Sequence, residues 1–156
     1  MAVILRKDLE RGRAAYEQWG QAARHALADG GEAGANGGNG GNGESGASTS
    51  VAYRASLDPE VPRSTQAMAV RYSLHLLERK APGPGVEVRV APWGAVKILD
   101  GPASDPHNLT PPDVIELEPN VWLRLACGIT TWSEERQAGH ISAVGERDDL
   151  SELLPL

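Results

Sequence analysis

The chain has 156 residues, a formal net charge of −6 and one cysteine. Binding to duplex nucleic acid or to anionic lipid headgroups depends on clustered Lys and Arg, which this acidic chain lacks, so we expect no nucleic-acid partner and no stable membrane insertion. A single cysteine excludes an intramolecular disulfide and a thiolate-rich zinc site. No apolar run approaches the roughly 20 residues of a membrane span.

The first residues place their charges after a short apolar run, which reverses the order in a secretory signal, so we expect a cytoplasmic protein. Residues 1–29 are expected to form an amphipathic helix, over 8–28, that packs on the rest of the domain. Its apolar face consists of Leu9, Tyr16, Trp19, Ala23 and Leu27. Gly30 and Gly31 are expected to end the helix.

Residues 30–50 are mostly Gly, Asn, Ser and Ala and contain half of the chain's 18 glycines. Burial of so few apolar side chains cannot offset the entropy lost on ordering, so we expect a flexible linker. The α+β domain then occupies residues 51–156. Its first part, 51–62, is typical either of a short edge strand or of an extended approach to the next helix.

A second helix is predicted from Ser64, its N-cap, to the charged end at 78–80. Its buried face repeats at steps of three and four and consists of Ala67, Val70, Leu74 and Leu77. Cations near its last turn complement the helix dipole. The Pro-Gly repeat at 82–85 prevents the helix from continuing.

Four segments have the pattern of strands. The alternating runs 86–90 and 95–99 flank a Pro-Trp-Gly turn and predict a hairpin. Residues 114–117 predict a third strand, and residues 140–144 predict a last one. Together they indicate one antiparallel sheet with helices on one face.

Two helices are predicted between the third and the last strand. Glu118-Pro119 opens the first, with proline at the first helical position, and Gly128 ends it. Thr131 and Glu134 have the spacing of a capping box and open the second helix. Residues 148–156 are expected to form a final turn whose leucines pack back on the core.

No group of side chains has the pattern of a catalytic or metal site, so we expect no enzymatic activity, no cofactor and no bound metal. Cys127 lies at the end of a helix, where the dipole disfavours a thiolate, and is interpreted as a small hydrophobe. The histidines lack the spacing of metal ligands, and of these the loop residue His107 is the most interesting. They are His25, His75, His107 and His140.

The tryptophans account for most of the aromatic side chains in a chain without Phe. They are Trp19, Trp93, Trp122 and Trp132. Each is interpreted either as a core residue or as part of the lining of an apolar cavity. Filled and hollow cores share one hydrophobic pattern, so both interpretations stay open.

Several runs, taken together, are characteristic of one family. They are residues 12–16, 69–74, 81–83, 86–96, 111–116, 122–128, 142–150 and 153–156, with Trp19 and Trp132. This combination resembles the actinobacterial branch of the sterol carrier protein family over residues 60–156 and the first helix. The sequence departs from the family pattern at Glu118, where Asp is usual, and in the loop 109–112.

The resemblance implies an α+β layer in which helices cover one face of a mixed sheet of about five strands. It also implies a hydrophobic tunnel between the layers for fatty acyl chains or sterols. The same domain forms the C-terminal part of mycothiol-dependent maleylpyruvate isomerase-like proteins. Their metal-binding helical bundle is missing here, so that activity is not carried over.

The leading hypothesis is a non-enzymatic carrier that binds and transfers a fatty acid, acyl-CoA or sterol-like lipid in a hydrophobic cavity. The predicted wall of that cavity consists of Leu74, Leu77, Val88, Val96, Ile98, Trp122 and Leu125. The main alternative is a structural or protein-interaction module with a fully packed core and an unknown protein partner. Weaker alternatives are an enzyme that uses His107 or Cys127, and an accessory to mycothiol-dependent isomerase-like chemistry.

Overall fold

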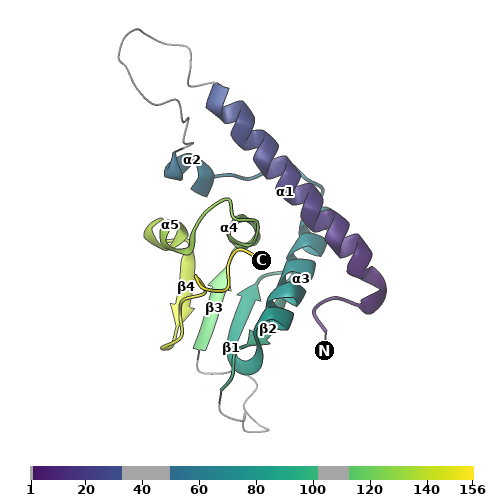
Figure 1. Ribbon diagram of the computed structural model, residues 1–156, viewed down its shortest axis with the longest axis vertical. Helices are drawn as coiled ribbons and strands as arrows, with labels where there is room; N and C mark the ends of the chain where they lie inside the picture. The colour runs from purple at the N-terminus through teal and green to yellow at the C-terminus, as the bar shows by residue number, and fades with distance from the viewer. Residues whose placement is uncertain (1, 33–49, 102–112) are drawn as a thin grey trace.

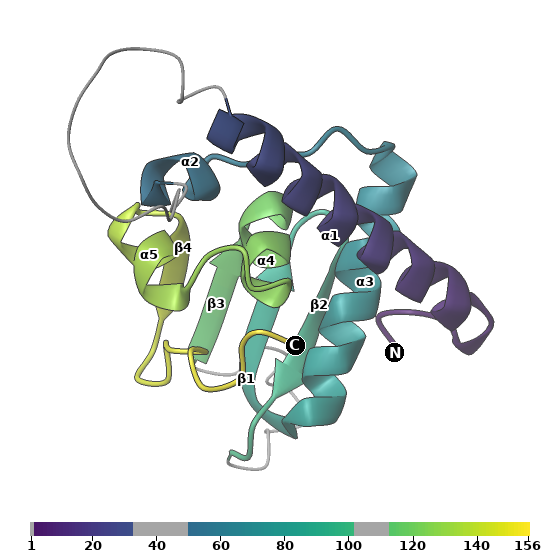
Figure 2. The ribbon, with the colours of Figure 1, turned by 45° about the horizontal axis from the view of Figure 1, so that its top comes forward.

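The computed structural model describes residues 2–32, 50–101 and 113–156. Within these ranges, helices cover one face of a four-stranded sheet (Figure 1, Figure 2). In chain order the elements are η1 (Arg6–Asp8), α1 (Leu9–Glu32), α2 (Val51–Ala55), α3 (Arg63–Lys80), β1 (Pro82–Val90), β2 (Gly94–Ile98), β3 (Asp113–Leu117), α4 (Pro119–Ala126), α5 (Trp132–Gln137) and β4 (Ile141–Val144). The predicted α+β class is confirmed. Most of the predicted linker and the His107 loop lie outside the described residues.

The sheet is mixed, with strand order β2-β1-β3-β4. β1 and β2 form the predicted antiparallel hairpin, in which Val88 lies opposite Val96. β1 and β3 are parallel, with Val88 opposite Ile115, whereas β3 and β4 are antiparallel. The prediction of an all-antiparallel sheet is therefore wrong at the β1–β3 pair, and the mixed sheet implied by the resemblance is confirmed. Four strands lie in the described ranges, against about five expected.

Alternation along β1 separates a buried face from a polar one. Val86, Val88 and Val90 are buried beneath the helices, whereas the intervening Glu87 and Arg89 lie on the opposite face of the sheet. There the Arg89 guanidinium contacts the carboxylates of Glu87, at 2.7 Å, and Glu116, at 3.2 Å. The apolar core therefore lies on one side of the sheet, between the strands and the helices.

α1 packs closely along α3 at Gly12. An added Cβ at Gly12 would lie 2.9 Å from the Cβ of Tyr72 on α3, so glycine permits this close approach. α1 continues to Glu32, past the glycines predicted to end it. The Tyr53 hydroxyl donates to the carbonyl of Ala26 at 3.0 Å, and this tertiary contact supports the last turns of α1.

Residues 51–55 form a short helix, α2, rather than either of the extended alternatives. The side chain of Ser50 caps α2 by accepting a hydrogen bond from the Tyr53 amide at 3.2 Å. Arg54 then joins α2 to the α4–α5 region by donating to the carbonyl of Ile129 at 2.9 Å and by pairing with the Glu134 carboxylate.

α4 is enclosed on every side. All six residues from Val121 to Ala126 are buried, as expected for a helix that is apolar around most of its circumference. Gly128, with φ of +74°, follows its end. The predicted capping box of α5 is confirmed, because Thr131 and Glu134 each accept a hydrogen bond from the other's backbone amide.

The last residues, 150–156, return to the helical layer and lie beside α4 (Figure 1). Leu150 is buried, and the Leu156 amide donates to the carbonyl of Ala126 at 3.0 Å. Lys80 at the end of α3 donates to the carbonyls of Leu153 and Pro155, at 2.8 and 3.3 Å. We call residues 150–156 the C-terminal segment. Among the described residues, no helix has both the length and the hydropathy of a membrane span.

Candidate functional site

The seven residues of the predicted wall all belong to one hydrophobic cluster between the helices and the sheet. Each is at most 6 % exposed. The wall residues therefore lie together although they come from α3, β1, β2 and α4, as the strand alternation and the helical spacing predict. Their burial shows that they pack against neighbouring side chains and do not face open solvent.

In the described part of the chain, one pocket borders this core at α4 and another lies at one end of the sheet. The first, which we call the α4–α5 pocket, has a volume of about 300 Å³ and lies between α4, the α4–α5 connection and the C-terminal segment. Its lining consists of Leu125, Gly128, Thr130, Thr131, Trp132, Ser133, Ser151, Leu154 and Pro155. Leu125 is a member of the predicted wall, so this pocket reaches the core at that residue. The other six wall residues line neither pocket.

The lining of the α4–α5 pocket is uncharged, and it includes a tryptophan with an unused donor. Trp132 is 4 % exposed, and its indole Nε1–H has no acceptor among the residues that the structure describes. The Thr130 hydroxyl already donates to Glu135 at 2.8 Å, and the Ser133 hydroxyl accepts from Gln137 at 3.3 Å. The pocket thus offers an uncharged lining in which apolar side chains alternate with the hydroxyls of threonines and serines.

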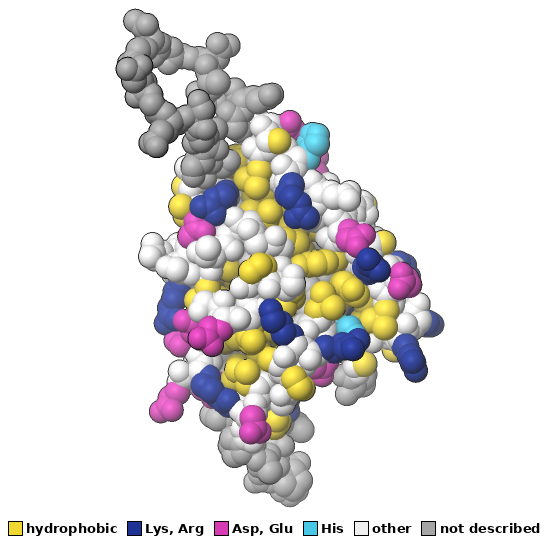
Figure 3. All heavy atoms as spheres, in the orientation of Figure 1, with side chains coloured by type: hydrophobic (Ala, Val, Ile, Leu, Met, Phe, Trp, Pro, Cys, Tyr) yellow, Lys and Arg dark blue, Asp and Glu magenta, His cyan; other side chains and the backbone are white. Residues whose placement is uncertain are grey.

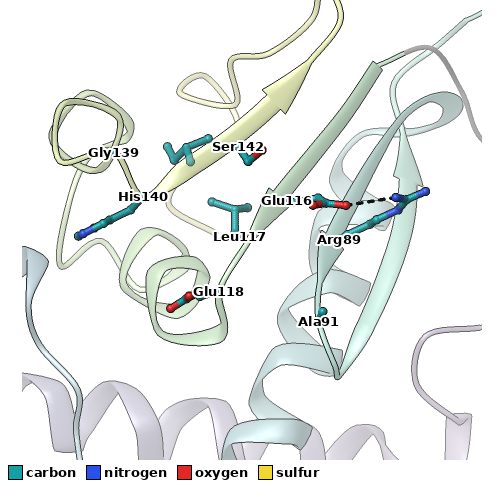
Figure 4. A pocket seen from close by; sticks show the side chains of 9 residues that line it. Arg89, Ala91, Glu116, Leu117, Glu118, Gly139, His140 and Ser142 are labelled. Carbon is teal, nitrogen blue, oxygen red and sulfur yellow. Dashed lines mark hydrogen bonds and ion pairs between the residues drawn. The ribbon is translucent and has the colours of Figure 1, made fainter.

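The second pocket, the sheet-end pocket, has a volume of about 410 Å³ and lies where β1 and β3 end and β4 begins (Figure 4). Its lining consists of Arg89, Ala91, Glu116, Leu117, Glu118, Gly139, His140, Ile141 and Ser142. Figure 4 shows Glu116 pointing toward Arg89, while the His140 ring points away from Leu117. Two carboxylates and a guanidinium make this pocket a poorer match to an apolar ligand than the α4–α5 pocket.

A buried polar network connects α4, α5 and the start of β4. The carboxylate of Glu135, which is fully buried, accepts from Arg124 at 2.6 and 3.1 Å and from Thr130 at 2.8 Å. The Nδ1 atom of His140 lies 2.6 Å from the same carboxylate, and since an ionised carboxylate only accepts, Nδ1 carries the proton. Arg124 also donates to the carbonyl of Leu57 at 2.9 Å.

The ionisation of Glu135 follows from this network. Burial opposes the charged carboxylate, but hydrogen bonds from Arg124, His140 and Thr130 outweigh burial, so the pKa of Glu135 lies below its ordinary value. Sequence analysis does not find this network. The only local signal is one arginine within the otherwise apolar run of α4, and its partner on α5 follows from tertiary packing.

Cys127 has the environment of an inert thiol. It is half-buried beside Tyr16, whose hydroxyl donates to the Ala126 carbonyl at 2.9 Å. Burial raises the pKa of the Cys127 thiol, and a thiol that stays protonated is a poor nucleophile. Cys127 therefore gives no support to the enzyme alternative. Among the residues described, no group of three or more His, Cys, Asp or Glu is placed to hold a metal ion.

The surface seen in Figure 3 has no large basic area. Hydrophobic side chains form a band along α1 on this face, and Lys and Arg side chains are scattered among acidic ones around it. Several half-buried hydrophobic residues pack against the core from α1 and the C-terminal segment, among them Leu9, Tyr16, Leu153 and Leu154.

Comparison with known proteins assigns the family. The model of a family described as bacterial SCP ortholog, where SCP stands for sterol carrier protein, matches residues 62–156, which is more than half of the chain. The chain belongs to this bacterial sterol carrier protein family. The matched region runs from α3 to the C-terminal segment and contains the whole described sheet, the seven wall residues and both pockets. α1 and α2 precede it. No curated protein matches the chain.

Proposed function

We propose that the protein binds and transfers an apolar ligand, a fatty acid, an acyl-CoA or a sterol-like lipid, without catalysing a reaction on it. The observation that carries the proposal is the uncharged α4–α5 pocket, which reaches the predicted wall at Leu125. Membership of a sterol carrier protein family supports the same ligand class at the level of the family. We propose a cytoplasmic location as well, in keeping with the sequence.

The size of the pocket limits how a ligand would bind. Small-molecule sites usually enclose about 300–1,000 Å³, so the α4–α5 pocket is at the lower end of that range. A long acyl chain would extend past Leu125 and separate side chains of the core. Each buried methylene group contributes about 0.8 kcal/mol, which offsets part of the free energy needed to separate them. The C-terminal segment is the element whose displacement would widen the pocket.

A titration with a fluorescent fatty acid tests the proposal. We expect saturable binding at one site, with displacement by unlabelled lipids at micromolar concentration. Leu125→Ala should weaken binding, whereas Leu123→Ala should leave it unchanged. Leu123 is an equally buried leucine of the same helix that does not line the pocket, so it controls for loss of stability. Absence of saturable binding to every lipid tested would refute the proposal.

The second candidate is a structural or protein-interaction module, and close packing of the seven wall residues favours it. In that case the core stays closed and the lipid titration gives no saturable signal. Mass measurement in solution would then be expected to show a stable complex with a second protein or a second copy. Lipid binding by a monomer would instead exclude this candidate.

A further inference from the structure

We propose that the α4–α5 pocket selects a lipid whose polar head is uncharged and accepts hydrogen bonds, such as an alcohol, ketone or ester, over a carboxylate or a phosphate. This inference rests on the proposed function and narrows its ligands, at the same pocket, from fatty acids and acyl-CoA toward sterol-like and other uncharged lipids. It is drawn from the charges and hydrogen bonds of the lining residues.

The lining of the α4–α5 pocket disfavours a charged head. None of the nine lining residues is charged. A carboxylate transferred from water into such surroundings loses its hydration and gains no cation in return. An alcohol or an ester loses much less hydration free energy, because it carries no net charge. The pocket therefore discriminates against an anionic head whatever the length of the chain attached to it.

The cations near the lining already have partners. Arg124, next to Leu125, is buried and pairs with Glu135. Lys80 donates to the carbonyls of Leu153 and Pro155, on either side of the lining residue Leu154. Arg54 pairs with the carboxylate of Glu134 and donates to the carbonyl of Ile129 at 2.9 Å. An anionic ligand would compete with Glu134 for Arg54 and with Glu135 for Arg124. Lys80 donates to neutral carbonyls and lies outside the lining.

Trp132 carries an unused hydrogen-bond donor. Buried N–H groups almost always have an acceptor, and the indole Nε1–H of Trp132 has none in the described part of the chain. The Nε1 atom is covered in the closed pocket. A ligand oxygen that separates its neighbours would supply the acceptor. Trp19 has the same unsatisfied indole N–H but lies on α1 and does not line the pocket. It is therefore a matched control.

The test compares dodecanol with dodecanoate on the full chain, at a pH well above the ordinary pKa of a carboxylic acid. We expect dodecanol to bind at least about tenfold more tightly. In isotope-labelled protein, dodecanol should shift the indole N–H resonance of Trp132 and leave that of Trp19 in place. Trp132→Phe should weaken dodecanol binding by roughly three- to tenfold, the value of one hydrogen bond, and Trp19→Phe should not.

The outcomes separate this inference from the proposed function. Equal or tighter binding of dodecanoate, or an unchanged Trp132 resonance at saturation with dodecanol, overturns the inference and leaves lipid binding in place. Failure of both lipids to bind overturns both. The comparison of the two lipids uses the unmodified protein, so it decides the question even where a tryptophan variant does not fold.

Discussion

At the scale of single residues, Arg124 and Glu135 form the most deeply buried ion pair among the described residues. Both side chains are almost completely buried, and their two hydrogen bonds join α4 to α5 next to the α4–α5 pocket. Removing one partner of a buried ion pair leaves an uncompensated charge, which costs about 3–5 kcal/mol. The pair therefore holds in place the elements that form the lining.

We predict that Arg124→Met lowers the free energy of unfolding by about 3–5 kcal/mol. The double variant Arg124→Met, Glu135→Met should lose less than the sum of the two single variants, because no charge remains unpaired in it. Urea denaturation of the four proteins measures this coupling. Additive losses would show that the two side chains do not act as a pair.

The lowered pKa of Glu135 predicts a dependence of stability on pH. A carboxyl group whose pKa is lower in the folded state stabilises the fold above its unfolded pKa, here about 4.5, and this contribution is lost as the pH falls through the folded pKa. As the pH falls below 4.5, the free energy of unfolding of the unmodified protein should therefore decrease more than that of Glu135→Gln. Parallel plots of the free energy of unfolding against pH for the two proteins would contradict the lowered pKa of Glu135.

At the scale of elements, the approach of α1 to α3 depends on Gly12. A methyl group there would meet the Cβ of Tyr72 at 2.9 Å and the Cδ1 of Ile4 at 2.7 Å. We predict that Gly12→Ala lowers the free energy of unfolding by about 1–3 kcal/mol, because overpacking exceeds the gain in helix propensity. Urea denaturation measures the change.

Gly20 is the control for this prediction. It lies in the same helix, and the atoms nearest to an added Cβ there would be the end of Arg24 at 3.1 Å and the Cys127 sulfur at 3.5 Å. Gly20→Ala should therefore be neutral or stabilise by up to about 1 kcal/mol. An equal loss of stability in Gly12→Ala and Gly20→Ala would mean that the contact with Tyr72 is not the reason why position 12 requires glycine.

Local signals predicted most elements of the fold. The alternation from Val86 to Val90 and the capping box of Thr131 with Glu134 act within a few residues, so they can be recognised without knowing the fold. The parallel β1–β3 pairing brings together strands far apart in the sequence, and no local pattern encodes it. The extension of α1 past Gly30 likewise depends on Tyr53, more than twenty positions away.

The candidate site was predictable only in part. Periodicity placed the seven wall residues in one core, including Leu125, where the α4–α5 pocket begins. The pocket itself depends on the C-terminal segment lying beside α4, which is a property of tertiary structure. The Glu135 network was not predicted, because charged residues such as Arg124 are ordinarily assigned to the surface.

At the scale of the whole molecule, the core is closed while lipid binding requires space, so binding and stability should be coupled. A ligand that binds only the folded state raises the free energy of unfolding by about 2.7 kcal/mol at a concentration 100 times its Kd. We predict a gain of this size for the preferred lipid in urea denaturation. A fluorescence response without a gain in stability would indicate adsorption to the surface or binding to unfolded chains.

Amide hydrogen exchange with and without saturating dodecanol or dodecanoate tests the central claim most directly. We predict slower exchange in residues 125–133 and 151–155, which include the lining of the α4–α5 pocket, and unchanged exchange in the first half of α1. Unchanged exchange throughout the protein, or protection confined to the sheet-end pocket, would contradict the proposal that this protein carries an apolar ligand next to α4.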